Sequence, residues 1–99
     1  MARYEIFADP NGVGFLLDVQ ADLLDELDTR VIVPLLPETP KRKPVRRLNP
    51  TFLIEGKPYV MYSQLLVALP KRMLTARRGN LSRHHDEIVA ALDMVFQGF

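Results

Sequence analysis

Helical periodicity occurs in one segment of this 99-residue chain, and that segment is the last one, residues 82–99. Ser82 is the predicted N-cap, and Asp86 and Glu87 place negative charge in the first turns, where the helix dipole favours it. Gly98 is the predicted stop signal. The apolar stripe that sets the helical period consists of Ile88, Ala91, Leu92, Val95, Phe96 and Phe99.

The residues before this helix show the alternation and turn signals of strands. Because strands and helices do not alternate along the chain, we expect a mainly β fold with one C-terminal α-helix. The antiparallel sheet should curl into a small barrel or sandwich, with the helix packed on it. Ile88, Leu92, Val95 and Phe96 are the predicted helix anchors. The expected strands are 3–8 with 15–20 as one hairpin, 30–36, 51–54 with 59–62 as a second hairpin, and 65–69.

Prolines and cations interrupt this strand pattern in two places. Residues 37–50 contain four prolines and are predicted to be irregular, with a possible short strand at 45–48. Residues 71–80 are also predicted to be irregular, with a possible strand at Met73 and Leu74. Pro34 cannot donate a hydrogen bond within its strand, so an edge or bulge position is expected.

The length predicts a single domain over residues 1–99. The sequence has no cysteine, no apolar run near eighteen residues and no export signal at the start. We therefore expect a cytoplasmic protein with no membrane contact and no disulfide.

The net charge of +1 conceals an uneven distribution. Eleven of the thirteen basic residues lie between Lys41 and Arg83, where Glu55 is the only acid. Such a region suits an acidic partner or a phosphate backbone. For a single pair such as Arg77 and Arg78, a solvated loop is the simpler interpretation.

The segment Asp22–Asp28 is acidic and contains three leucines. It lacks the glycine-bearing spacing of a calcium loop, so no metal site is predicted. Leu23 and Leu24 are adjacent and cannot both face one core, which predicts that at least one lies at an interface.

No catalytic constellation is evident in the sequence. Ser63 and Ser82 do not lie in a glycine elbow, and His84 and His85 lack the spacing of two zinc ligands on one helix face. No cofactor-binding motif is present either. A metal-free ribonuclease needs only a few cations and a hydroxyl or acid, so Thr75, Arg77 and Arg78 leave that alternative open.

Four segments together resemble the CcdB family, the toxins of CcdA–CcdB toxin–antitoxin modules. They read FLLDVQADLLD, RVIVPLL, PTFLIEGKPYVMYSQLLVALP, and LSRHHDEI through VFQGF. The resemblance implies a barrel of the Src-homology-3 type, as in the toxins Kid and MazF, and a two-fold homodimer. It also implies a protein that is not an enzyme but binds the A subunit of DNA gyrase and traps the gyrase–DNA cleavage complex. A CcdA-like antitoxin would neutralise it, and operator DNA would be bound only through that antitoxin.

The resemblance implies gyrase contacts at Leu23, Leu24, Asp93, Gln97, Gly98 and Phe99. The spacing of Asp86, Asp93 and Gln97 places them opposite the apolar stripe. This chain has Gln97 where the family's best-known members have tryptophan, and Asp93 where an asparagine is usual.

The predicted antitoxin-binding residues are cations of the proline-rich segment. Together with residues 71–83 they should attract an acidic antitoxin and raise its association rate. Two alternatives to gyrase poisoning stay open, an endoribonuclease on the same barrel and a non-toxic homologue that binds only antitoxin. The predicted antitoxin contacts are Lys41, Arg42, Lys43, Arg46 and Arg47.

Overall fold

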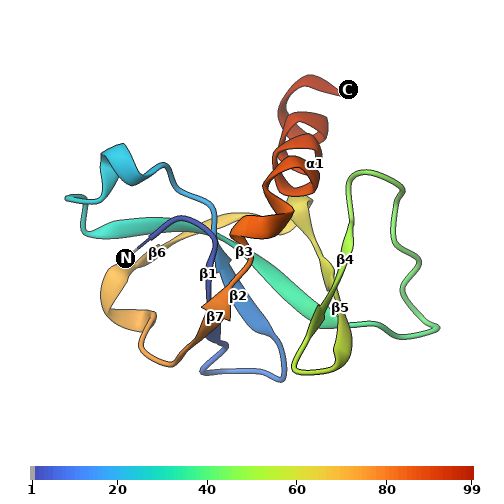
Figure 1. Cartoon of the computed structure of the whole chain (residues 1–99), viewed down its shortest axis with the longest axis horizontal. Coiled ribbons are helices and arrows are strands. Elements are labelled where there is room, and N and C mark those ends of the chain that lie inside the picture. Colours follow the sequence, from blue (N-terminus) through green and yellow to red (C-terminus); the bar gives the residue numbers. More distant parts are fainter. Residues whose placement is uncertain (1) are drawn as a thin grey trace.

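Across residues 2–99, which the computed structural model describes, seven strands form one curled antiparallel sheet with a single α-helix at the C-terminal end (Figure 1). The order of the strands is β4-β5-β3-β2-β1-β7, and β6 pairs with β3. The predicted fold class is confirmed. The strands are β1 (Glu5–Ala8), β2 (Phe15–Asp18), β3 (Thr29–Pro37), β4 (Thr51–Ile54), β5 (Lys57–Met61), β6 (Val67–Pro70) and β7 (Arg77–Asn80).

The long strand β3 lies at the centre of the sheet. It pairs with β2 along one side, and along the other side it pairs first with β6 and then with β5. Pro34 lies where the partner changes, and its carbonyl accepts a hydrogen bond from the N–H of Tyr62 at 3.0 Å. The predicted edge or bulge position is wrong. The nitrogen of Pro34 has no hydrogen to donate, and it faces the gap between β6 and β5. No hydrogen bond of the sheet is therefore lost there.

Both predicted hairpins are present, β1 with β2 and β4 with β5. The second turns at Glu55 and Gly56, whose φ angles of 54° and 80° are those of a two-residue hairpin with a left-handed backbone. β1 begins later than predicted because Tyr4 has a φ of 73°. The Tyr4 N–H still donates to the carbonyl of Asp18 at 2.6 Å, which continues the pairing with β2.

Four short segments differ from the sequence predictions. Residues 45–48 form a turn rather than a strand. The predicted strand at 65–69 divides into the 3-10 turn η2 (Ser63–Leu65) and β6, and the residues around Met73 belong to a second 3-10 turn, η3 (Lys71–Met73). The strand β7 was not predicted, because it is a polar edge strand that pairs only with β1 and so lacks apolar alternation.

Two apolar clusters lie on opposite faces of the sheet, which explains why β2 is buried along its whole length. The larger cluster lies on the face against which α1 packs and includes Leu17, Leu35, Met61, Ile88 and Ala91. The smaller cluster consists of Phe7, Leu16, Ile32 and Leu74.

The C-terminal helix α1 (His85–Gln97) follows a 3-10 turn, η4 (Ser82–His84). Ser82 is therefore not the N-cap; its N–H donates to Asn80 Oδ1 at 2.6 Å. Gly98 ends the helix in the left-handed conformation, with a φ of 78°. α1 projects away from the sheet beyond its first turns (Figure 1).

This projection explains why the predicted apolar stripe is buried only near its start. Ile88 is fully buried and Leu92 packs against the core. Val95 is half-buried, but the predicted anchor Phe96 is 69% exposed. That prediction was wrong because the sheet does not extend far enough to cover the end of the helix.

Candidate partner-binding surfaces

The end of α1, residues 96–99, forms the first surface and is called the helix tip below. Phe96 and Phe99 are 69% and 71% exposed, and Gln97 and Gly98 are exposed as well. Two large aromatic side chains in water on a projecting element are typical of an interaction site. Asp93, one turn earlier, is half-buried.

The second surface is the segment Asp22–Asp28, called the acidic loop, which begins with the 3-10 turn η1 (Asp22–Leu24). Leu23 is 93% exposed, and Leu24 and Leu27 are about half exposed. Both adjacent leucines thus lie outside the core, and the assignment of at least one of them to an interface stays a prediction. Apolar side chains surrounded by carboxylates suit a partner with an apolar pocket and a basic rim.

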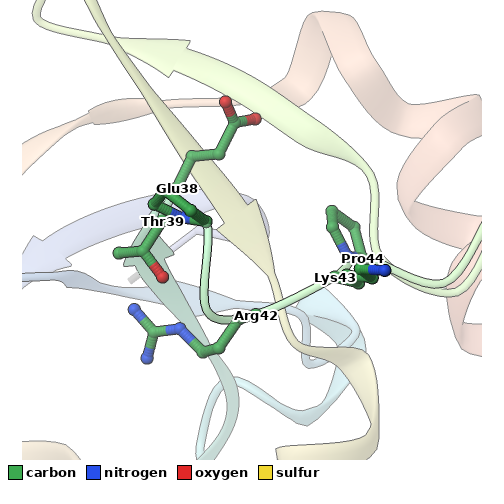
Figure 2. A pocket seen from close by; sticks show the side chains of 6 residues that line it. Glu38, Thr39, Arg42, Lys43 and Pro44 are labelled. Atoms are coloured by element: carbon green, nitrogen blue, oxygen red, sulfur yellow. The ribbon is translucent and has the colours of Figure 1, made fainter.

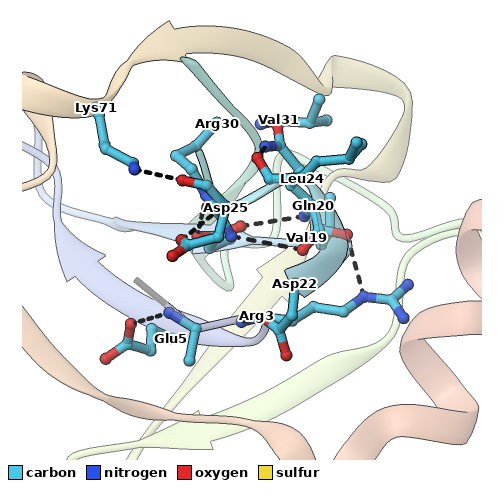
Figure 3. A network of polar contacts seen from close by, with 12 residues as sticks. Arg3, Glu5, Val19, Gln20, Asp22, Leu24, Asp25, Arg30, Val31 and Lys71 are labelled. Carbon is cyan, nitrogen blue, oxygen red and sulfur yellow. Dashed lines mark hydrogen bonds and ion pairs between the residues drawn. The ribbon is translucent and has the colours of Figure 1, made fainter. Parts of the chain in front are cut away.

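A buried arginine supports the acidic loop from beneath. Arg30 Nε lies 2.8 Å from Asp18 Oδ2, with both side chains fully buried, and Arg30 Nη1 lies 3.2 Å from Asp25 Oδ1. Lys71 Nζ donates to the carbonyl of Asp25 at 2.5 Å (Figure 3). Two cations from β3 and η3 thus hold one residue of the loop.

Gln20 makes a second connection between the acidic loop and the sheet. Its Nε2 donates to the carbonyl of Leu24 at 3.0 Å, and its Oε1 accepts the N–H of Val31, also at 3.0 Å (Figure 3). The neighbouring Arg3 N–H donates to Asp22 Oδ1 at 2.8 Å. Because these bonds fix the loop backbone at several points, its leucines are presented in a preformed arrangement.

Burial raises the pKa of the Asp18 carboxyl, although the Arg30 guanidinium and the Gln20 N–H act in the opposite direction. Desolvation of the carboxylate is thus the larger effect. The pair therefore contributes a defined geometry rather than a large net stabilisation.

The helix tip and the acidic loop are the two elements to which the resemblance assigns gyrase contacts. Within one chain they are far apart, because η1 lies at one side of the sheet and the tip lies above it (Figure 1). The predicted contact residues are therefore brought together in two groups rather than one.

The third surface is the segment Lys41–Arg47, called the basic loop, whose seven residues are all exposed. A pocket of about 320 Å³ lies at its start, lined by Glu38, Thr39, Pro40, Arg42, Lys43 and Pro44 (Figure 2). Arg42 Nη2 donates to the carbonyl of Pro37 at 3.1 Å, and its guanidinium lies 5.7 Å from the ring centre of Tyr62. All five predicted antitoxin-binding cations thus lie on one surface loop.

The cations considered for ribonuclease chemistry are engaged with carboxylates. Arg77 pairs with Glu5, and Arg78 Nη1 lies 2.8 Å from Glu55 Oε2. Thr75 is exposed, and in the described part of the chain its side chain makes no hydrogen bond to either arginine. Among residues 2–99, no group of three or more histidines and carboxylates is placed to hold a metal ion.

The two histidines have structural contacts at the start of α1. The His84 ring packs against Phe52, with 4.7 Å between ring centres. His85 Nδ1 lies 2.5 Å from the Tyr4 hydroxyl. Burial raises the pKa of Tyr4, so this hydroxyl is protonated at neutral pH and can donate to the imidazole.

The sequence did not predict the roles of four residues that support or form these surfaces: Arg30, Gln20, Lys71 and Phe96. One signal was available for the first, because Arg30 opens an apolar, β-branched strand and Asp18 ends another. Charged residues within otherwise buried strands are typically paired with each other. The other three depend on how distant segments pack.

Comparison with known proteins places this geometry in a family. The model of the family described as CcdB protein matches residues 3–98. A comparison with curated protein sequences gave no significant match. In the part of the chain that the structure describes, no helix has the length and apolar character to cross a membrane.

Several solved structures share the fold at low sequence identity. An endoribonuclease from a mycobacterial species, solved in complex with its cognate antitoxin, has a TM-score of 0.75 and 16% identity over 97% of this chain and 94% of its own. The Mycobacterium tuberculosis toxin MazF-mt6 has a TM-score of 0.75 and 14% identity over 95% and 96% of the two chains. These similarities establish the fold, while the match over residues 3–98 shows that the chain belongs to the CcdB family, toxins of the CcdA–CcdB toxin–antitoxin system.

Proposed function

We propose that this toxin binds the A subunit of DNA gyrase and traps the gyrase–DNA cleavage complex, acting as an inhibitor rather than as an enzyme. The observation that carries the proposal is the family match over residues 3–98. It is supported by the location of the implied contacts, since the helix tip and the acidic loop both expose large apolar side chains. Gyrase acts on cytoplasmic DNA, so the proposed site of action is the cytoplasm.

Phe96 and Phe99 offer a physical reason why Gln97 is compatible with this function. An interface usually depends on a few large side chains, often aromatic, that fill pockets in the partner. Where other family members have tryptophan, this chain has two exposed phenylalanines on either side of Gln97. We propose that they provide the apolar contact, and that Asp93 and Gln97 provide the polar part.

A homodimer would reconcile this function with the separation of the two surfaces. In a two-fold dimer each surface occurs twice, and both helix tips can lie near the axis. A symmetric gyrase target would then meet both tips together. We propose the homodimer as the active form.

The endoribonuclease alternative rests on structural similarity at 14–16% identity, which carries the fold but not the activity. The cations considered for it, Arg77 and Arg78, are each paired with a carboxylate at the surface.

The proposal is tested with purified toxin and gyrase from the same host. We expect inhibition of supercoiling and accumulation of cleaved DNA, and no cleavage when the toxin is incubated with RNA. Full supercoiling activity and no cleaved DNA at saturating toxin would refute gyrase poisoning. RNA cleavage would select the ribonuclease, and non-toxic overexpression with tight antitoxin binding would select a homologue that has kept only that interaction.

We also propose a CcdA-like antitoxin as the neutralising partner. Lys41, Arg42, Lys43, Arg46 and Arg47 give one exposed surface a strong positive potential, which favours the approach of an acidic chain. Long-range attraction of this kind raises the association rate and needs no direct contact with each cation.

A further inference from the structure

The two end strands of the curled sheet, β4 and β7, come close to each other at one place (Figure 1). Among residues 2–99, β4 pairs only with β5 and β7 only with β1, so each has one edge without a partner strand. Arg78 Nη1 on β7 lies 2.8 Å from Glu55 Oε2 in the turn after β4, which connects the two ends. This place, formed by residues 53–55 and 78–83, is called the seam below.

On the β7 side of the seam, the main chain of Asn80 faces away from the sheet. Asn80 lies opposite Glu5, and the Glu5 N–H donates to the Ala2 carbonyl at 3.2 Å rather than to β7. The next pair is hydrogen-bonded, because the Leu81 N–H donates to the Tyr4 carbonyl at 2.8 Å. Bonded and non-bonded pairs alternate along antiparallel strands, so the N–H and carbonyl of Asn80 point to the free edge. Such groups are a template for pairing with another chain.

A pocket of about 190 Å³ in the seam combines apolar and cationic side chains. Its apolar lining includes Ile6, Ile54 and Leu81, each at most 5% exposed, and also Leu53, which is 67% exposed. The pocket can therefore cover one aliphatic side chain of a partner, and the same partner would cover Leu53.

The cations of the pocket lie on the β7 side of the seam. Arg78 and Arg83 both line it, and in the described part of the chain Arg83 makes no ion pair. The acid of the pocket, Glu55, lies on the β4 side and is paired with Arg78. Charge complementarity therefore favours an acidic partner, placed along β7.

We propose that an extended acidic segment of the antitoxin binds in the seam and pairs with the free edge of β7. This inference rests on the antitoxin partner proposed above. In strand addition, main-chain hydrogen bonds provide affinity and pockets for alternate side chains provide specificity. Asn80 supplies the main-chain groups, the pocket takes one aliphatic side chain, and Arg83 binds a carboxylate two positions along the segment, on the same face.

The seam and the basic loop have different parts in this proposal. The basic loop attracts the acidic chain at long range, whereas the seam is where one segment of that chain becomes ordered. A second copy of the toxin is a less suitable occupant of the seam, because two seams facing each other would bring Arg78 and Arg83 of both copies together. Like charges brought together in this way disfavour association.

The experiment measures binding of the cognate antitoxin to the purified toxin by surface plasmon resonance, which gives Kd and both rate constants. The seam variant is Arg83→Glu. The matched control is Arg72→Glu, which replaces an exposed arginine of η3 that also makes no ion pair in the described chain. Each substitution removes one positive charge and adds one negative charge, so both change the formal net charge from +1 to −1. Thermal unfolding and size-exclusion chromatography compare the folding and oligomeric state of the variants.

We expect Arg83→Glu to raise Kd by at least about tenfold, chiefly through faster dissociation, because the new carboxylate repels the one that Arg83 would bind. Arg72→Glu should stay within about threefold of the wild type, since it loses only long-range attraction. In the wild type, hydrogen exchange of the Asn80 amide should slow by about tenfold or more when the antitoxin binds. The Leu81 amide, which already donates to Tyr4, should change less.

The outcomes separate this docking site from the antitoxin partner itself. Equal losses in Arg83→Glu and Arg72→Glu, or unchanged exchange at Asn80, would overturn the docking site while the antitoxin stays the partner. Absence of binding by the wild type would overturn both. If Arg83→Glu but not Arg72→Glu altered the oligomeric state of the free toxin, the seam would be an interface between copies of this chain, and the proposal would be overturned.

Discussion

Arg30 Nε lies 2.8 Å from Asp18 Oδ2, and neither side chain is exposed to solvent. Arg30 is also bound to the carboxylate of Asp25 in the acidic loop, at 3.2 Å. One guanidinium thus joins the interior of the sheet to a candidate binding surface. Loss of Arg30 would therefore disturb both the core and the acidic loop.

Arg30→Met should destabilise the fold by about 3–5 kcal/mol, because it leaves the Asp18 carboxyl buried without its cation. Urea denaturation followed by circular dichroism measures the loss. Arg78→Met is the matched control, since it breaks an ion pair with Glu55 that is about half exposed and should cost roughly 1 kcal/mol or less. Equal losses for the two variants would contradict the structural role of Arg30.

The ionisation of Glu5 makes the stability of the fold depend on pH in the acidic range. Burial acts to raise the pKa of Glu5, but hydrogen bonds from the Ala2 N–H and the Arg77 guanidinium, with the attraction of Arg77, more than offset it, so the pKa lies below its ordinary 4.5. The unfolded chain therefore binds this proton more readily, and the stabilisation is present above pH 4.5 and lost as pH falls through the folded pKa. Glu5→Gln should lower the melting temperature at pH 7 and have a smaller effect at pH 3. A deficit that stayed constant between these pH values would contradict this prediction.

Phe99→Ala should weaken gyrase binding without altering stability. Phe99 is 71% exposed, so its truncation should change the free energy of unfolding by less than about 0.5 kcal/mol. As an interface anchor it should contribute about 2 kcal/mol, or roughly thirtyfold in Kd. Surface plasmon resonance with immobilised gyrase A subunit measures this loss. Leu53→Ala, which removes a side chain of similar exposure on β4, should leave the Kd unchanged.

The association rate of the antitoxin should fall as salt is raised, because eleven cations and one acid lie between Lys41 and Arg83. Stopped-flow measurements between 50 and 500 mM salt should show a decrease of about tenfold or more in the association rate, with a smaller change in the dissociation rate. An association rate that does not respond to salt would show that this charge does not attract the antitoxin.

The parts of the fold that sequence predicts are those set by local rules. The hairpin at Glu55 and Gly56 and the presence of a helix around Ile88 follow from turn residues and periodicity, which involve neighbours along the chain. The strand β7 does not, because it is defined by pairing with β1, more than seventy residues earlier. Nothing local marks it as a strand.

The candidate surfaces divide in the same way. Two adjacent leucines in an acidic loop, Leu23 and Leu24, predict an interface from the sequence alone. Both are exposed in the structure. The exposure of Phe96 is not visible, because its spacing is that of a core residue and only the extent of the sheet leaves it uncovered. The support of the loop by Lys71 is likewise a product of the fold, since Lys71 and Asp25 are joined across 46 positions.

Lys71→Met should loosen the acidic loop while leaving the core intact. The ammonium of Lys71 donates to the Asp25 carbonyl at 2.5 Å, and a hydrogen bond to a charged group contributes about 1.5–3 kcal/mol. Hydrogen exchange of the Asp25 and Leu27 amides, which close the turns of this loop, should therefore accelerate by about tenfold or more. Arg72→Met, an exposed neighbour, serves as the control and should leave their exchange unchanged. If Lys71→Met also weakens gyrase binding with no change in melting temperature, Lys71 acts by positioning the leucines; unchanged exchange would show that the loop holds its shape without it.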